Sequence, residues 1–153
     1  MIELIVGIAV FLILYFIVIR EKAELGLYIP QVYTDLSSIE IEFIRLVNQH
    51  RISLGLNPLL VEELSSKICE DMVDYCLDLD KDVTHDGFQA RSKETKSLLC
   101  GEVCGQGYKT AKGFFDAYLK SSKGHAKILE GEQYNWIGVS IKNGKNYCLL
   151  TTY

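Results

Sequence analysis

A continuous apolar run at the start of the chain constrains its fold most strongly. Residues 2–19 are apolar apart from Glu3, and Arg20 and Lys22 come directly after them. As an α-helix, this run would span about 27 Å, close to the ~30 Å hydrocarbon core of a bilayer. The basic residues beyond it suit the headgroup level. The run therefore predicts a single membrane-spanning helix, which places a transmembrane anchor in residues 1–22.

A cleaved secretory signal is the alternative interpretation of this run. Such a signal has a basic start, a shorter apolar stretch and a small-residue cleavage site. The chain begins Met1-Ile2-Glu3 without a basic side chain, and Arg20-Glu21-Lys22 does not resemble a cleavage site. We therefore favour an uncleaved anchor. The flanking basic residues indicate a cytoplasmic location for the C-terminal domain, but a bias of two charges leaves the side of the membrane open.

The rest of the chain has the size of one globular domain. Residues 23–36 contain Gly26 and Pro30 without a clear period and are predicted to form a linker. Residues 37–153 then form a single domain of ordinary size. The formal net charge is −4, and the sequence has no run of Lys and Arg. This excludes the phosphate-neutralising surface of a nucleic-acid-binding protein.

Two amphipathic helices are predicted in the first half of this domain. The first begins at Ser37 or Ser38, and it ends at Gly55. The second covers about residues 61–79. Apolar residues at steps of three or four define the expected core faces, which are Ile41, Ile44, Leu46, Val47 and Leu54 in the first helix and Leu64, Ile68, Met72, Cys76 and Leu79 in the second.

The second half changes to loops, short strands and short helices. We expect a loop over residues 81–96 carrying His85 and Arg91, and a buried strand from Leu98 to Val103. A third helix is expected over residues 110–119. Its inward side chains are Phe114, Phe115 and Tyr118.

The end of the chain is predicted to form a β-hairpin. A turn or short helix over residues 122–130 carries His125, and two apolar segments lie beyond it at 136–141 and 147–153. Asn143-Gly144 lies between them, and Asn-Gly favours the type I′ turn that joins antiparallel strands. Helices around a small antiparallel sheet define an α+β domain.

A candidate site lies in the stretch from His85 to His125. It contains two of the chain's three histidines, and it contains Glu102 at the end of an apolar run, where a carboxylate needs a partner. Imidazole and carboxylate groups bind divalent metals or transfer protons. The third histidine, His50, lies in a predicted helix beside Arg51, and we interpret it as a surface or hydrogen-bonded residue.

The order of these features resembles the CAP superfamily, which comprises the cysteine-rich secretory, antigen 5 and pathogenesis-related 1 proteins, in its bacterial SCP-like form. The resemblance covers about residues 39–153. It rests on the first-helix sequence F-I-R-L-V-N-Q-H-R-I-S-L-G-L-N-P-L, the second-helix sequence L-S-S-K-I-C-E-D-M, and a set of later features, namely His85, Gly101-Glu102, Tyr118-x-x-Ser121-x-x-x-His125 and Ile137-Gly138-Val139.

The resemblance implies an α-β-α sandwich whose cleft is lined by His85, Glu102 and His125. Family members are linked to lipids, to divalent metals in the cleft and to proteolysis. The chain departs from the family pattern at Val103, where an amide is usual, and at Lys123, where a proline is usual. These departures weaken the prediction of catalysis more than the prediction of the fold.

The three cleft residues are compatible with two chemical roles. Two imidazoles and one carboxylate match the protein ligands of a catalytic zinc site, and magnesium or calcium are the other metals considered. In the second role, Glu102 orients an imidazole without binding metal. The sequence contains no His-Glu-x-x-His motif and no Ser or Cys with an argued nucleophilic role.

The five cysteines are predicted to be reduced and mainly buried. Cys69 and Cys76 lie about 10 Å apart along a helix, which is too far for a disulfide. Cys100 and Cys104 flank Glu102, and they either pair with each other or serve as small apolar residues. We favour the second interpretation because the predicted core needs no disulfide.

Three classes of function are consistent with the sequence. The first is a membrane-anchored module that binds a lipid, a peptide or a divalent metal in the cleft. The second is an accessory subunit that associates with other membrane proteins, and the third is a metal-dependent hydrolase. The anchor and the altered cleft motif favour the first two. The resemblance implies an extracytoplasmic domain, whereas the flanking charges favour the cytoplasm.

Overall fold

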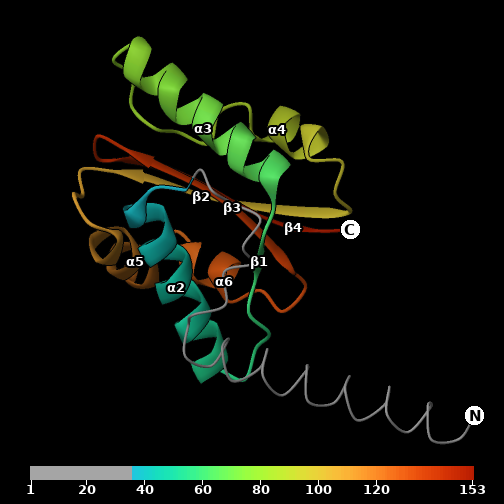
Figure 1. The fold of residues 1–153 in the computed structure, drawn as a ribbon. Coiled ribbons are helices and arrows are strands. Elements are labelled where there is room, and N and C mark those ends of the chain that lie inside the picture. The colour runs from blue at the N-terminus through green and yellow to red at the C-terminus, as the bar shows by residue number, and fades with distance from the viewer. Residues whose placement is uncertain (1–35) are drawn as a thin grey trace, which may run out of the picture.

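The structure, a computed structural model, describes residues 36–153 (Figure 1). The predicted anchor at 1–22 and nearly all of the linker at 23–36 lie outside the described residues. Within these residues, no helix combines the length and apolar character that a membrane crossing requires.

Nine helices and strands make up the described domain. In chain order they are α2 (Ser38–Ser53), β1 (Leu60–Val61), α3 (Glu63–Asp78), α4 (Phe88–Glu94), β2 (Leu99–Gln106), α5 (Ala111–Lys120), α6 (His125–Leu129), β3 (Trp136–Lys142) and β4 (Lys145–Thr152). The α+β class is confirmed. The sheet is mixed rather than purely antiparallel, because β1 pairs in parallel with β3.

The strands lie in the order β1-β3-β4-β2, so β4 is an inner strand and β2 is an edge strand. Helices cover both faces, with α3 and α4 on one side of the sheet and α2, α5 and α6 on the other (Figure 1). Alternate residues of β4 enter two different cores. Tyr147 and Leu149 pack with α3, whereas Cys148 and Leu150 pack with α2 and α5. The domain is therefore an α-β-α sandwich.

Local sequence signals explain the ends of several elements. Ser37 precedes α2, and its backbone N–H donates to the Glu40 carboxylate at 2.7 Å, as in a capping box. The carboxylate of Glu62 accepts from the first backbone N–H groups of α3. Asn143 and Gly144 both have positive φ, which agrees with the predicted type I′ turn between β3 and β4.

The predicted core faces of the first two helices are confirmed in part, since Ile44, Val47, Ile68 and Cys76 are buried. Ile41, Leu54, Leu64 and Leu79 are exposed instead. The buried positions that the prediction missed include Phe43 in α2 and Cys69 and Val73 in α3. The buried face of each helix is thus shifted by about one residue, because the face of the sheet on which the helix packs, and not the apolar pattern alone, determines burial. The inward positions of Phe114, Phe115 and Tyr118 in α5 are confirmed.

The predicted loop over 81–96 is wrong in its second half, where α4 forms. This helix has only seven residues, and it begins after Gly87, whose φ of 76° is left-handed. A glycine in this conformation starts the helix without the polar capping side chain that usually marks a helix start in a sequence. The helix has one buried residue, Arg91, so it has no apolar period to detect.

Gly138 lies where α3 crosses the sheet. A Cβ atom at this position would be 2.2 Å from the carbonyl carbon of Ser65 and 2.3 Å from the nitrogen of Ser66. We expect Gly138→Ala to push α3 away from β3 and to destabilise the domain by about 3 kcal/mol. Urea unfolding followed by fluorescence measures this. Gly107→Ala is the comparison, because Gly107 lies in an open turn and its φ of 92° adds only a backbone cost of about 1–2 kcal/mol. An equal loss in both variants would contradict the packing argument.

Candidate cleft at the edge of the sheet

The candidate site is built around Glu102, which is 3% exposed in β2. Arg91 in α4 donates two hydrogen bonds to it, from Nε to Oε2 at 2.6 Å and from Nη2 to Oε1 at 2.8 Å. Paired N–H···O bonds of this kind are the strongest form of Arg–carboxylate contact. This ion pair is the partner that a carboxylate in an apolar strand requires, and it joins α4 to the sheet.

The Arg91 side chain also contacts Asp86 and Tyr147. Its Nη1 donates to the Asp86 carbonyl at 2.7 Å, and its guanidinium lies 5.3 Å from the centre of the Tyr147 ring. The Tyr147 hydroxyl in turn donates to the Thr84 carbonyl and accepts from the Thr84 N–H. These contacts fix the loop that precedes α4 and so position His85.

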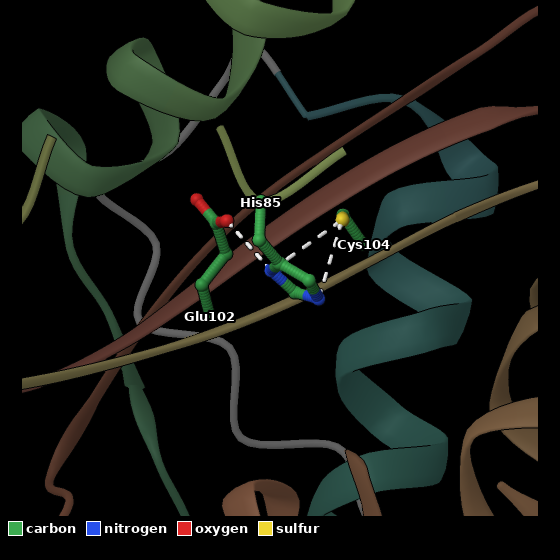
Figure 2. Close-up of side chains that lie close together, drawn as sticks. All are labelled: His85, Glu102 and Cys104. Carbon is green, nitrogen blue, oxygen red and sulfur yellow. Dashed lines mark hydrogen bonds and ion pairs between the residues drawn. The ribbon is translucent and has the colours of Figure 1, made fainter. Parts of the chain in front are cut away.

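His85 contacts the same carboxylate. Its Nδ1 lies 2.9 Å from Oε1 of Glu102, as Figure 2 shows. The Glu102 carboxylate also accepts two bonds from Arg91, so it is the acceptor toward His85 and Nδ1 of His85 is the donor. This bond assigns the proton to Nδ1 and leaves the lone pair of the ring on Nε2. About half of the His85 side chain is exposed.

Cys104 completes the cluster drawn in Figure 2. Its sulfur lies 3.7 Å from both ring nitrogens of His85 and therefore packs beside the ring. Burial, and then the charge of Glu102, raise the pKa of the Cys104 thiol to about 12. A neutral thiol is a poor ligand and a poor nucleophile. In this state Cys104 serves as packing for the His85 ring.

His125 approaches from the opposite face of the sheet, as the first residue of α6. Its ring centre lies 5.8 Å from that of His85 and 5.1 Å from that of Tyr118, which packs edge-on. The Tyr118 hydroxyl donates to Asn146, and this bond fixes the ring against which His125 packs. The Nε2 atom of His125 is buried without a hydrogen-bond partner among the described residues. This nitrogen therefore lacks the partner that a buried polar atom requires, and a ligand or a water in the cleft would supply one.

The three predicted residues line one cleft at the edge of β2. The cleft has a volume of about 330 Å³. Its other lining residues come from both helical layers and from β2, and they are Phe88, Cys100, Gly101, Lys123, Ile128 and Tyr134. Sequence reasoning missed Arg91 and Cys104. The one signal that pointed to Arg91 was the need of Glu102 for a partner.

The pairing of Glu102 with Arg91 makes this carboxylate a weaker candidate for the three-ligand metal set of His85, Glu102 and His125. Oε1 of Glu102 accepts from Arg91 and His85, and Oε2 accepts from Arg91. A cation bound by this carboxylate would also lie beside the guanidinium. The geometry favours the second role considered for Glu102, which is to orient an imidazole. The two imidazoles are then the groups left for a divalent metal, and such binding stays a prediction.

His50 and the five cysteines have no direct part in a metal site of two imidazoles. Nε2 of His50 lies 2.9 Å from Oε1 of Glu130, which agrees with a hydrogen-bonded residue outside the cleft. All five cysteines are free in the structure. Cys100 and Cys104 lie four residues apart on β2, about 13 Å along a strand, so they are too distant to pair with each other.

The titration of His125 gives a testable pH dependence. Burial, then the charges of His85 and Lys123, lower the pKa of His125 from its ordinary value of 6.5. The unfolded chain then binds a proton more readily, so the stability is fully present above the ordinary pKa and is lost as the pH falls through the lowered pKa. We expect His125→Gln to lose less stability than wild type between about pH 7.5 and 5. Parallel melting curves for the two proteins would contradict this.

The fold and the cleft together define an α-β-α sandwich protein with two facing histidines at a sheet edge. The sequence profile of the cysteine-rich secretory protein family matches residues 44–152. The chain therefore belongs to this family, as the resemblance to the CAP superfamily predicted. No curated protein sequence matches the chain significantly.

Solved structures with the same fold come from several bacteria. An extracellular protein with an SCP domain from Bacillus anthracis has a TM-score of 0.67 at 18% identity, covering 79% of this chain and 45% of that protein. A cysteine-rich secretory protein from Staphylococcus aureus has a TM-score of 0.65 at 14% identity, covering 88% and 48%. An outer surface protein of Borrelia burgdorferi has a TM-score of 0.63 at 18% identity, covering 73% and 90%. The chain thus spans about half the length of the first two proteins.

Proposed function

We propose that this protein is a membrane-anchored binding module whose ligand lies in the cleft between His85 and His125. The observation that carries this proposal is the pairing of Glu102 with Arg91. A hydrolytic cleft needs a carboxylate with a free lone pair directed at water or metal. Here the carboxylate is used to hold His85, while both imidazoles keep an Nε2 atom for contact with a ligand.

The cleft is suited to an organic ligand with both apolar and polar parts. Phe88, Ile128 and Tyr134 provide apolar and aromatic walls, and the imidazoles and Lys123 provide the polar groups. Pockets that bind small organic groups have this composition. The proposal covers a lipid or a peptide, and in an accessory subunit the ligand would be a segment of another membrane protein.

Native mass spectrometry of the full chain extracted in mild detergent tests this proposal. We expect a bound mass on the wild-type protein that is lost in His125→Phe, which fills the cleft. Lys127→Phe changes an exposed residue of the same helix outside the cleft and should keep the bound mass. Retention of the ligand in both variants would place it elsewhere. Turnover of peptide, ester or peptidoglycan substrates that stops in Glu102→Gln would instead support a hydrolase.

We propose that residues 1–22 anchor the domain and that the domain lies on the extracytoplasmic side. The apolar run at 2–19 supports the anchor. The descriptions of the Bacillus and Borrelia proteins as extracellular and outer surface proteins support the side. The charges of Arg20 and Lys22 point the other way, but two charges are a weak determinant.

The anchor predicts that the full chain stays in the membrane fraction through a carbonate wash with its N-terminus intact. Mass spectrometry of the washed protein identifies the first residue. A second sample, intact cells treated with protease, should lose the domain if it lies outside. Recovery of a soluble product that starts near Ala23 would show cleavage instead of anchoring.

A further inference from the structure

The outer edge of β2 offers unpaired backbone groups beside the cleft. Gly107 N–H donates to the Gly144 carbonyl at 2.8 Å, and the register of β2 with β4 continues this pairing. Alternate residues of an antiparallel edge strand point their backbone groups away from the sheet. On this register, Cys100, Glu102 and Cys104 point outward, and in residues 36–153 no hydrogen bond from a loop or helix reaches their backbone groups.

The outer edge of β2 forms the floor of the cleft, and we call this part of the cleft the trough. Cys100, Gly101 and Glu102 lie at the floor, with Phe88 on one side and Ile128 on the other. Beyond the trough the same strand region continues with Leu98 and Leu99, which are 78% and 51% exposed. An edge strand whose outward N–H and C=O groups have no partner is a template for another strand, and the one charge of β2, Glu102, is paired with Arg91. A second copy of the domain would carry the same side chains beside its own β2. These side chains would prevent the two β2 edges from approaching each other.

The charge of the trough is positive. Glu102 is neutralised by Arg91 behind it, and Lys123 on the rim has no carboxylate partner within the part of the chain that the structure describes. The complementary group is a carboxylate.

We infer that the ligand is an extended peptide that carries a carboxylate and adds as a strand along the outer edge of β2. This inference rests on the proposed function and names the ligand class of the same cleft. The backbone of the peptide would pair with Cys100 and Glu102, and alternate side chains would enter the pocket between Phe88 and Ile128. Its carboxylate would meet Lys123.

A random heptapeptide phage library panned on the full chain in detergent supplies the probe. We expect the selected peptides to carry Asp, Glu or a terminal carboxylate. N-methylation of the synthetic peptides should reduce affinity about tenfold or more at every second residue and little in between, because each paired N–H contributes one hydrogen bond. This scan leaves the protein unchanged. Equal effects at all positions would overturn strand addition.

Two protein variants test the edge itself. Cys100→Pro removes one outward N–H, a change that an edge strand tolerates, whereas Cys100→Ala keeps the N–H and removes the thiol. We expect the proline variant to bind the selected peptide about tenfold more weakly than the alanine variant. Lys123→Glu should weaken binding at least as much. Equal binding by the proline and alanine variants would contradict the assigned edge.

The outcomes separate this inference from the proposed function. A bound lipid that is lost in His125→Phe, together with no enriched peptide, would overturn the peptide inference and keep the binding module. No bound mass and no enriched peptide would overturn both.

Discussion

Replacing Arg91 by Met is expected to destabilise the domain by about 3–5 kcal/mol. The change leaves Glu102 as a buried charge without its partner, and the loss of one member of a buried pair has a cost of this size. The fluorescence of Trp136, the single tryptophan of the chain, reports urea unfolding of the full chain in detergent. His85 should lose its fixed orientation in the same variant, because Glu102 would no longer be held.

A double-mutant cycle distinguishes the pair from general damage. Arg91→Met with Glu102→Gln removes both charges, so the double variant should be less destabilised than the two single losses added together. Lys142→Met is the control, since Lys142 forms partly exposed ion pairs with Glu70 and Asp74, and it should lose about 1 kcal/mol or less. Additive losses across the cycle would show that Arg91 and Glu102 do not depend on each other.

Replacing Arg51 by Met is expected to have an effect of similar size for a different reason. Arg51 is fully buried, and it donates to the backbone carbonyls of four residues. These residues are Asn57, Leu129, Gly131 and Tyr134. No carboxylate contacts it among the described residues, so the bonds to carbonyls alone satisfy its charge. Losing them leaves several buried acceptors without donors, a loss of about 3–5 kcal/mol.

The Arg51 variant should also disturb the cleft at a distance. The bond from Nη1 to the Leu129 carbonyl, at 2.7 Å, holds the end of α6, and His125 begins that helix. NMR signals of the His125 ring should therefore shift in Arg51→Met. Arg45→Met removes an exposed pair with Glu42 and should leave both stability and these signals nearly unchanged. Unshifted His125 signals in the Arg51 variant would show that α6 is held by other contacts.

The sequence predicted those parts of the fold that depend on local signals. Asn143-Gly144 indicated the hairpin correctly, and Phe114, Phe115 and Tyr118 indicated the inner face of α5. The parallel strand β1 was missed because its two residues are defined only by pairing with Trp136 and Ile137, far along the chain. The helix faces were only partly predicted, because each face is set by the side of the sheet on which the helix packs.

The residues of the candidate site were found in part for a similar reason. The spacing pattern of the family resemblance indicated His85, Glu102 and His125, and all three line the cleft. Arg91 was assigned to a loop, and its role depends on a side chain eleven residues away on another element. The ligand role of Glu102 was inferred from residue type and from the family resemblance. Whether its lone pairs are free depends on neighbours that only the tertiary structure brings together.

The position of β4 has a consequence for how the protein is made. This strand is last in chain order, yet it lies between β3 and β2 in the sheet. While the ribosome is still adding residues 145–152, β2 has no neighbour to pair with, and α3 has only part of the sheet to cover. Apolar faces such as those of Ile68 and Val73 then stay exposed on the nascent chain. The domain can therefore complete its sheet only after residues 145–152 have been synthesised and are free to pair with both β3 and β2.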